Sequence, residues 1–396
     1  ESFTTRSLSR FHSTLPWYKR SMQRVHVTTT DAAYDVVVER GLLEHAAEHV
    51  RSAVGARRLF VVTDPGAWRA QGLRLEAGLQ GLNYTLLTMQ GGEEHKRIQQ
   101  VETMAELMYA AGADRKCCVV TFGGGIAGDV GGFLAASYMR GVDVIQIPTT
   151  LLAQVDAAIG GKTGVNLASG KNLIGAFYQP RLVLIDPAVL TTLPEREYRA
   201  GLYELIKHGV IWSENLFDLM TNQRDTVLAR NVETLEEIIV KSVCIKAEVV
   251  SQDEHEGNLR RILNFGHTLG HALETETGYS LLLHGEAVAF GMIAAAHLAE
   301  AIQLLPRDIR QVIVETVFAY GPIPSLEGIS AAHLVERLRG DKKTIEGKVH
   351  FVLPDRIGHV QVMSDIDFSM VEQAAAKALV LCSEVSSRSI PHSVTS

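Results

Sequence analysis

Six short apolar runs recur along the first half of the chain, and amphipathic or turn-rich segments separate them. The runs cover residues 36–38, 59–62, 85–87, 118–122, 144–147 and 182–185. Buried strands that alternate with helical stretches predict an α/β fold with a parallel sheet covered on both faces. Such sheets bind ligands at the carboxyl ends of their strands, so a site is expected at that edge.

The pattern changes after residue 194. Apolar residues then recur with helical spacing, most clearly over 233–250 and 286–302. We therefore predict two domains, an α/β domain over residues 25–192 and a mostly α-helical domain over residues 193–380. A cleft between two domains is a usual place for a site.

The two ends of the chain differ in composition from the rest. The first 24 residues carry five Lys or Arg, many Ser and Thr, and only Glu1 as an acid. This composition resembles a transit peptide, although a disordered extension is the interpretation that we prefer. Residues 381–396 are predicted to form a tail, which is Ser-rich and expected to fray from Ser383 on.

The composition is that of an ordinary soluble globular protein, with 46% hydrophobic and 21% charged residues. No uninterrupted apolar stretch reaches eighteen residues, so no membrane span is expected. The formal net charge of -7 argues against general nucleic-acid binding. The four cysteines form no CxxC pair and no evident disulfide framework, which fits a reducing compartment and predicts a cytoplasmic protein.

A glycine-rich turn follows the predicted strand at 118–122. Gly123, Gly124 and Gly125 lead into Ile126-Ala127-Gly128-Asp129. Glycines at a strand-to-helix turn let backbone N–H groups approach a pyrophosphate, and the helix N-terminus adds partial positive charge. The turn is not the usual GxGxxG, so tight helix packing is the alternative. Thr149 and Thr150 follow the next strand and could supply hydroxyl groups at the same edge.

Three histidines fall within eighteen residues of the second half. His267 and His271 are four residues apart and share one helical face, and His284 follows. Histidines at this spacing suit zinc or a similar divalent ion, and only some of them need be ligands. Upstream, Glu204 and Lys207 could add a carboxylate and a base. A core or surface role is the alternative for each histidine alone, but the cluster favours a site.

Several cations stand beside Gly or Asn in apolar surroundings. They are Lys162, Lys171, Lys246, Arg260, Lys342 and Lys343. Each alone is typical of a solvated surface charge. Together, in an acidic chain, they indicate a multiply charged anionic substrate.

At this level of detail the chain closely resembles the 3-dehydroquinate synthase family. The run GGGIAGDVGGFLAASYMRGVDVIQIPTTLLAQVDAAIGGKTGVNLASGKNLIGAFYQP over 123–180 is similar to the family signature almost throughout. So are AGLYELIKHG, KAEVVSQDEHEGNLRRILNFGHTLGHALE, LHGEAVAFGM and DKKTIEGKVHFVLP. The resemblance runs from about residue 34 to 378 and implies a Rossmann-like N-terminal domain followed by a mostly α-helical C-terminal domain.

The resemblance also implies roles for particular residues. The metal ligands fall on Glu204, His267 and His284. The catalytic and substrate-binding residues fall on Asp156, Lys162, Asn172, Lys207, Lys246, Glu256, Arg260, Asn264, His271 and Lys342, with Arg140 reaching the neighbouring subunit's phosphate site. The NAD contacts fall on Asp64, Glu93, Lys96, Gly123, Gly124, Gly125, Asp129, Thr149, Thr150, Lys162 and Lys171.

The sequence departs from the family pattern at two places. Gly66 stands two residues after Asp64, where the family usually has Asn, which puts one adenosine-side contact in question. Residues 167–169 read Leu-Ala-Ser, where family members often have His-Pro-Leu.

The family's substrate is a phosphorylated sugar acid, 3-deoxy-D-arabino-heptulosonate 7-phosphate, which closes to 3-dehydroquinate with loss of phosphate. The resemblance implies NAD and zinc or cobalt as cofactors, and a homodimer. The alternatives are another sugar phosphate cyclase, a metal-dependent polyol dehydrogenase and a catalytically inactive NAD-binding regulatory protein. The form of the Asn264 region argues against the first. In a polyol dehydrogenase, Lys162, Lys246 and Arg260 would lack a purpose. An inactive regulatory protein would be expected to lose a metal ligand.

Overall fold

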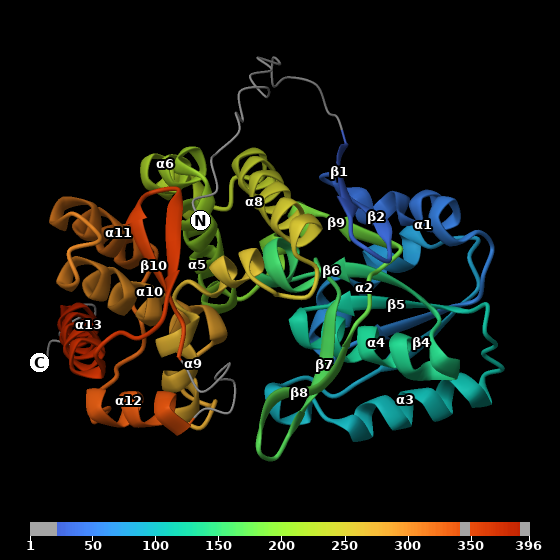
Figure 1. Cartoon of the computed structure of the whole chain (residues 1–396). Helices are drawn as coiled ribbons and strands as arrows, with labels where there is room; N and C mark the ends of the chain where they lie inside the picture. Colours follow the sequence, from blue (N-terminus) through green and yellow to red (C-terminus); the bar gives the residue numbers. More distant parts are fainter. Residues whose placement is uncertain (1–21, 341–348, 389–396) are drawn as a thin grey trace, which may run out of the picture.

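The computed structural model describes residues 22–340 and 349–388 of the chain. A sheet with flanking helices occupies one side of the molecule, and most of the remaining helices occupy the other (Figure 1). Most of the predicted extension, the segment with Lys342 and Lys343, and the last residues of the predicted tail lie outside the described residues.

The main sheet has seven strands. They are β1 (Gln23–Thr28), β2 (Ala33–Val38), β3 (Leu59–Thr63), β4 (Tyr84–Thr88), β5 (Cys118–Gly123), β6 (Asp143–Pro148) and β9 (Leu182–Ile185). Their order is β1-β2-β9-β6-β5-β3-β4, and every neighbouring pair is parallel except β1 with β2. The predicted α/β class is confirmed, and all six predicted strands are present.

Helices cover both faces of this sheet. They are α1 (Ala46–Val54) and α2 (Pro65–Gly78) with η1 (Leu42–His45) on one face, and α3 (Ile98–Ala110) and α4 (Gly125–Ser137) on the other. Successive residues of a strand point to opposite faces. Accordingly, Val61 belongs to the core that contains Leu75 of α2, whereas Val62 belongs to a second core with Val130 of α4. Burial on both faces explains why these strands are continuous apolar runs.

Short helical turns follow the strands at the edge that carries the site. They are η2 (Glu93–His95), the π-helical turn η4 (Ala153–Ala157) and η5 (Pro187–Thr192), whereas η3 (Tyr138–Arg140) precedes β6 at the opposite edge. An antiparallel hairpin, β7 (Lys162–Leu167) with β8 (Gly170–Phe177), projects from the side that carries the site (Figure 1). The sequence analysis predicts no strand here, because Lys, Asn and Gly interrupt the apolar pattern.

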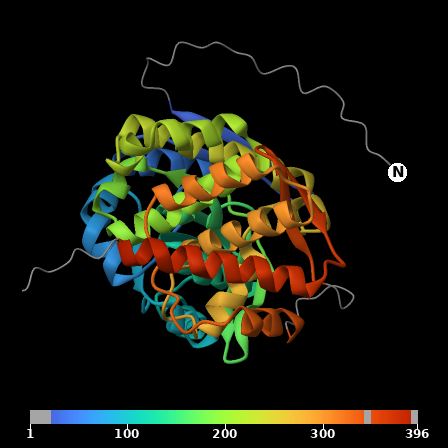
Figure 2. The ribbon, with the colours of Figure 1, turned by 90° about the vertical axis from the view of Figure 1, so that its left-hand side faces the viewer.

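The second half of the chain is mostly helical, as predicted. It contains α5 (Glu195–Trp212), α6 (Glu214–Asn222), α7 (Arg224–Leu228), α8 (Val232–Gln252), η6 (Leu259–Asn264), α9 (His267–Glu276), α10 (His284–Ala301), α11 (Arg307–Ala319), α12 (Ala331–Gly340) and α13 (Phe368–Arg388). Figure 2 views this helical side, with α13 running across the front. A second hairpin, β10 (Phe351–Arg356) with β11 (His359–Met363), packs beside α5 and α10 and was not predicted. No helix of the described ranges has the length and apolarity that a membrane span requires.

The ordered parts of the chain begin earlier and end later than predicted. Strand β1 starts at Gln23, inside the predicted extension, and α13 continues to Arg388, inside the predicted tail. The expectation of fraying from Ser383 on is wrong for this stretch. Cys382 is buried, and the hydroxyl of Ser386 donates to the carbonyl of Ile323 at 2.8 Å, so tertiary contacts hold the helix end in place. The division into two domains near residue 192 stays a prediction.

Candidate active site

A cleft of about 2160 Å³ lies between the carboxyl ends of the sheet strands and helices α9 and α10. The predicted site residues that line it are Asp64, Glu93, Lys96, Gly124, Gly125, Asp129, Thr149, Thr150, Asp156, Lys162, Lys171, Asn172, Lys246, His271 and His284. Those outside its lining are Gly123, Arg140, Glu204, Lys207, Glu256, Arg260, Asn264 and His267. Both halves of the chain contribute to the walls, so a ligand here would touch both.

The glycine turn forms one end of the cleft. Gly123 ends β5, and α4 begins at Gly125 with no side-chain cap. Its first-turn N–H groups are therefore available to an anion, and the helix dipole adds to their attraction. A Cβ on Gly124 would lie 3.0 Å from Cγ2 of Thr150, so a larger residue at this position would crowd the Thr150 side chain. The arrangement fits the pyrophosphate of a dinucleotide.

Asp64 has a structural role in addition to its predicted one. Its Oδ1 accepts from the backbone N–H groups of Gly66 at 2.8 Å and Ala67 at 3.0 Å, and so caps α2. The side chain still lines the cleft. Gly66 brings no side chain to this wall, as its departure from the family pattern implied.

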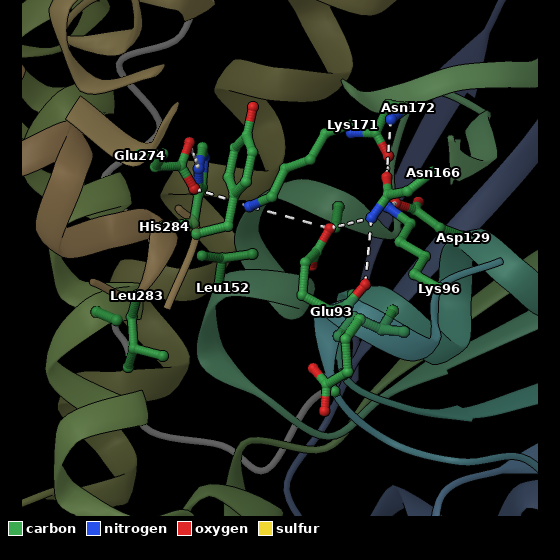
Figure 3. A pocket seen from close by; sticks show the side chains of 18 of the residues that line it. Glu93, Lys96, Asp129, Leu152, Asn166, Lys171, Asn172, Glu274, Leu283 and His284 are labelled. Atoms are coloured by element: carbon green, nitrogen blue, oxygen red, sulfur yellow. Dashed lines mark hydrogen bonds and ion pairs between the residues drawn. The ribbon is translucent and has the colours of Figure 1, made fainter. Parts of the chain in front are cut away.

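A buried lysine organises the cofactor side of the cleft (Figure 3). The Nζ of Lys96 donates to Oδ2 of Asp129 at 2.5 Å and to Oδ1 of Asn172 at 2.6 Å. Burial raises the pKa of Asp129, and the charge of Lys96 opposes that shift only in part. Asn172 has a φ of 54°, and Asn166 accepts from its backbone N–H at 2.8 Å. Asn166 also donates to Oε1 of Glu93 at 2.7 Å.

The sequence analysis missed Asn166 as a site residue. The only signal was its place in the GGKTGVN run, four residues after Lys162. Its function in the structure is to hold both Glu93 and Asn172, which it does through separate atoms of one amide.

Glu204, His267 and His284 converge beside the cleft, and of the three His284 lines it. Oε1 of Glu204 lies 4.0 Å from Nε2 of His267 and 3.8 Å from Nε2 of His284. Ligand atoms around a tetrahedral zinc ion are about 3.4 Å apart, so a small approach would close this set around a metal. Glu204 is fully buried, and its Oε1 has no hydrogen-bond partner within the described part of the chain. A buried carboxylate oxygen of this kind is suited to bind a cation.

Close packing of the helices brings these ligands together. A Cβ on Gly285, next to His284, would lie 1.9 Å from the carbonyl oxygen of Ala200, one turn before Glu204 on α5. A Cβ on Gly270 would lie 2.8 Å from the carbonyl oxygen of Ala287 on α10. Only glycine permits these backbones to approach so closely, so both glycines shape the site.

The pKa of His267 agrees with a metal site, whereas that of His284 moves in the opposite direction. Burial lowers the pKa of His267 well below its ordinary value, and the charge of Lys207 and the other two histidines lower it further. A neutral imidazole is the form that binds a metal. Burial also opposes charge on His284, but contacts with Glu274 and the charge of Glu204 outweigh it and raise the pKa.

Glu274 is a second residue that the sequence analysis missed. Its Oε2 lies 3.6 Å from Nδ1 of His284, and its Oε1 accepts from Nζ of Lys171 at 3.0 Å. His271 lies at the same carboxylate, with Nε2 4.0 Å from Oε2, and His271, Glu274 and His284 form a second possible ligand set. Burial alone would raise the pKa of Glu274, but His284 and Lys171 lower it to about 2. The available signal was a glutamate three residues after His271 on one helix.

Lys246 and Asp156 form an ion pair in the centre of the cleft. Burial lowers the pKa of Lys246 to about 8, although the Asp156 carboxylate opposes this shift. Burial would raise the pKa of Asp156, yet the charges of Lys246 and Lys207 hold it well below the ordinary value. Behind this pair, the buried Nζ of Lys207 contacts Oε2 of Glu204, which links the predicted base to the predicted metal ligands.

Glu256 joins two other predicted residues. Its Oε2 accepts from Nζ of Lys162 at 2.6 Å, and its Oε1 accepts from Nδ2 of Asn264 at 2.8 Å. Burial would raise the pKa of Glu256, but the charge and hydrogen bond of Lys162 lower it, so this carboxylate is ionised. The structure thus groups these three residues at one end of the β7–β8 hairpin.

Arg260 is buried and bonded to main chain. Its Nη1 donates to the carbonyl of Glu254 at 2.5 Å and its Nη2 to that of Gly160 at 3.0 Å, while Nε is buried and has no hydrogen-bond partner among the described residues. The spacing of four residues would allow a helical pair with Glu256, but the structure does not form one. Glu256 has a φ of 62° and precedes η6, and no ion pair joins the two side chains among the described residues.

Arg140 lies away from the cleft. It is exposed, and both Met139 and Arg140 have positive φ values, 49° and 70°. Two such residues in succession are strained, which is typical of positions held for a function. Lys342 falls in 341–348, outside the described residues.

Comparisons with known proteins agree with this geometry. The family model described as 3-dehydroquinate synthase N-terminal matches residues 86–200, and that described as 3-dehydroquinate synthase C-terminal matches residues 201–344. A 3-dehydroquinate synthase of Solibacter usitatus is 55% identical over 353 residues, which are 89% of this chain and 98% of the relative. One from Koribacter versatilis is 49% identical over 356 residues, 89% of this chain and 97% of the relative.

Solved structures of related cyclases share the fold. A 2-epi-5-epi-valiolone synthase from Streptomyces hygroscopicus with NAD+ and Zn2+ bound has a TM-score of 0.82 and 29% identity, covering 89% of this chain and 99% of its own. A 2-deoxy-scyllo-inosose synthase complexed with carbaglucose-6-phosphate, NAD+ and Co2+ has a TM-score of 0.78 and 26% identity, covering 90% and 99%. A glycerol dehydrogenase from Schizosaccharomyces pombe, with a TM-score of 0.63 at 14% identity over 94% of each chain, is similar in fold alone.

Proposed function

The chain belongs to the 3-dehydroquinate synthase family, and from this premise we propose that it converts 3-deoxy-D-arabino-heptulosonate 7-phosphate to 3-dehydroquinate and phosphate. This reaction is a carbon–oxygen lyase step of the shikimate pathway, which leads to aromatic amino acids. The observation that carries the proposal is one cleft lined by a glycine turn, by two lysines and by His284, which converges with Glu204 and His267 in a metal-type ligand set. The lysines are Lys162 and Lys246. A simple dehydrogenase has no use for that pair of cations.

The residues present fit both cofactors. Glu204, His267 and His284 would hold a zinc or cobalt ion, which polarises the substrate's hydroxyl oxygens when bound. The glycine turn, Asp129 and Thr150 would hold NAD, which would supply reversible hydride acceptance at C5 without net oxidation of the substrate.

The cations of the cleft suit the two ends of the substrate. We assign Lys162, Asn172, Asn264 and His271 to the phosphate. The ion pair of Lys162 with Glu256 and the hydrogen bond of Asn264 to the same carboxylate already hold those two side chains in one place. A phosphate with its stronger charge would compete with Glu256 for both donors. Glu256, once released, could pass a proton toward His271.

Lys246 is assigned to the substrate carboxylate, with Arg260 behind it. Lys246 lines the cleft, and the positive charge of Arg260 is near enough to contribute to its lowered pKa. Two cations at this place would select a substrate that carries a carboxylate. Lys207 and Asp156 remain to assist removal of a hydroxyl proton, since Lys207 contacts Glu204 and lies near enough to lower the pKa of Asp156.

We also propose a cytoplasmic homodimer in which Arg140 of one subunit reaches the phosphate site of the other. Arg140 is exposed, has a strained backbone and lies outside the lining of its own cleft. A two-fold dimer is the commonest closed assembly, and it would place the same arginine at both sites.

The proposed function is tested with the metal-loaded protein, a trace of NAD and the heptulosonate phosphate. Phosphate and dehydroquinate should appear in equal amounts, with NAD needed only in catalytic quantity. Accumulation of NADH in step with product would identify a dehydrogenase instead. Equal turnover of a heptulose 7-phosphate that lacks the carboxylate would identify a different sugar phosphate cyclase.

A further inference from the structure

His284 lies between two carboxylates that come from different helices. Its Nε2 is 3.8 Å from Oε1 of Glu204 on α5, and its Nδ1 is 3.6 Å from Oε2 of Glu274 on α9. The nitrogens of an imidazole point in different directions, and the one that donates its proton leaves the other free to bind a metal. The partner at Nδ1 therefore decides where His284 offers a lone pair.

His267 is oriented in the same way by a different group. Its Nδ1 lies 3.1 Å from the carbonyl oxygen of Phe265, which can only accept, and its Nε2 faces Glu204. Both histidines of the proposed metal set thus have an acceptor at Nδ1 and Nε2 directed to the same carboxylate. For His267 the acceptor is main chain, and for His284 it is the side chain of Glu274.

Glu274 is itself held from the opposite wall of the cleft. It is only 2% exposed, and its second oxygen accepts from Nζ of Lys171 at 3.0 Å. Lys171 comes from the β7–β8 hairpin, and Figure 3 shows it reaching across to Glu274. Its Nζ also lies 4.5 Å from the centre of the Tyr279 ring and 3.9 Å from Oε1 of Glu93. A buried carboxylate with one oxygen on a lysine and the other on a histidine has little freedom to turn.

We propose that Glu274 is a positioning residue of the metal site. It holds His284 as the tautomer with its proton on Nδ1, so that Nε2 faces Glu204, and Lys171 keeps the carboxylate in place. The negative charge also makes the imidazole a stronger ligand. This inference rests on the proposed metal set of Glu204, His267 and His284, and extends it by a residue outside that set.

The first test measures zinc affinity of the full-length protein by competition with a chelating dye, without NAD or substrate. Glu274→Gln keeps the shape of the side chain but removes its charge, and the zinc Kd should rise about tenfold to a hundredfold. The matched control is Glu276→Gln, two residues later on α9. Glu276 accepts from Arg337 at 2.9 Å and contacts His333 at 3.3 Å, so it is an ion-paired glutamate of the same helix. The zinc Kd of Glu276→Gln should equal that of the wild type.

Two results would overturn the proposal. A zinc Kd within twofold of the wild type would show that Glu274 does not position the site. A loss of zinc as complete as that in Glu204→Gln would make Glu274 a ligand, as in the set of His271, Glu274 and His284.

A second measurement needs no substitution of Glu274. In zinc-loaded protein labelled with ¹⁵N-histidine, the His284 signals, assigned by difference from His284→Gln, should show the proton on Nδ1. A proton on Nε2 would overturn the proposal even if Glu274→Gln did not fold. Neither measurement uses the heptulosonate phosphate. A protein that failed to make dehydroquinate would refute the proposed function and leave the role of Glu274 standing.

Discussion

The Nζ of Lys246 lies 2.5 Å from both the carboxylate Oδ1 and the main-chain carbonyl oxygen of Asp156. Lys246 comes from the middle of the long helix α8, and Asp156 from the π-helical turn η4 after β6. One ammonium thereby fixes both the side chain and the backbone of a turn that faces the cleft. Because the lysine is buried, its pKa is lowered to about 8 despite this carboxylate.

The lowered pKa predicts an alkaline limb in the activity of the wild type. Lys246 binds a carboxylate as the ammonium, which is fully present below pH 8 and is lost as the pH rises through about 8. We expect kcat/KM, which reports the free enzyme, to fall about tenfold per pH unit above that value. A rate that stayed constant to pH 10 would contradict this assignment.

Two variants identify the group that causes the limb. Lys246→Arg should abolish it, because a guanidinium keeps its proton throughout this range. Asp156→Asn should move the limb to lower pH, since the Asp156 carboxylate favours the ammonium and opposes the effect of burial. A limb that both variants leave unchanged belongs to another group.

Metal content should separate the two possible ligand sets. Treatment with EDTA should abolish activity, and zinc or cobalt should restore it. Glu204→Gln and His267→Ala should each lose nearly all bound metal by elemental analysis, because each removes one of three protein ligands. His271→Ala should retain its metal and lose activity through the phosphate site. The opposite pattern, in which His271→Ala loses its metal and His267→Ala retains it, would favour the set that contains Glu274.

The sequence predicted the central strands of the main sheet well because they are buried on both faces, whereas the partly exposed edge strand β1 was not predicted. A run such as Cys118 to Phe122 needs no knowledge of its neighbours to be recognised as a strand. The β7–β8 hairpin could not be predicted in this way. Much of its surface is exposed, with Leu173 and Phe177 open to solvent, and its polar residues serve the cleft rather than a core.

The site was predictable where chemistry is concentrated in short motifs. His267 and His284 belong to such motifs, and the structure brings them to Glu204 from a distant helix. Glu274 and Asn166 were missed for a physical reason. Their importance depends on contacts between remote segments, such as that of Glu274 with Lys171, 103 residues earlier, which no local spacing reveals.

Complementation between inactive variants tests the proposed dimer. Arg140→Ala should weaken binding of the phosphorylated substrate without changing NAD or metal binding. Mixed in equal amounts with Lys162→Gln, it should regain activity, since half of the dimers would be mixed and each would have one complete site. Random assembly thus predicts about a quarter of wild-type activity. A monomer with full activity at nanomolar concentration would contradict the shared site.

The position of Arg260 calls for an experiment that separates binding from structure. Its guanidinium holds the carbonyls of Glu254 and Gly160, and Gly160 lies in the turn between Asp156 and Lys162. Removal of two buried hydrogen bonds from a charged donor costs about 2–5 kcal/mol of unfolding free energy. Arg260→Ala should therefore melt at a lower temperature and lose some activity on any substrate.

If Arg260 also contacts the substrate carboxylate, Arg260→Ala should lose additional activity, and only a substrate that carries a carboxylate can show this second loss. We expect Arg260→Ala to reduce kcat/KM for the heptulosonate phosphate by on the order of tenfold to a thousandfold, mostly through KM. The analogue without the carboxylate should suffer a much smaller loss, which measures the structural part alone. The matched control is Arg230→Ala, because Arg230 donates to the carbonyls of Leu190 and Leu193 at 2.8 and 2.7 Å but lies outside the cleft lining. Arg230→Ala should have a lower melting temperature than the wild type, and its kcat/KM should change equally for both substrates. If Arg260→Ala behaves in the same way, Arg260 holds the Gly160 turn and Lys246 alone recognises the carboxylate.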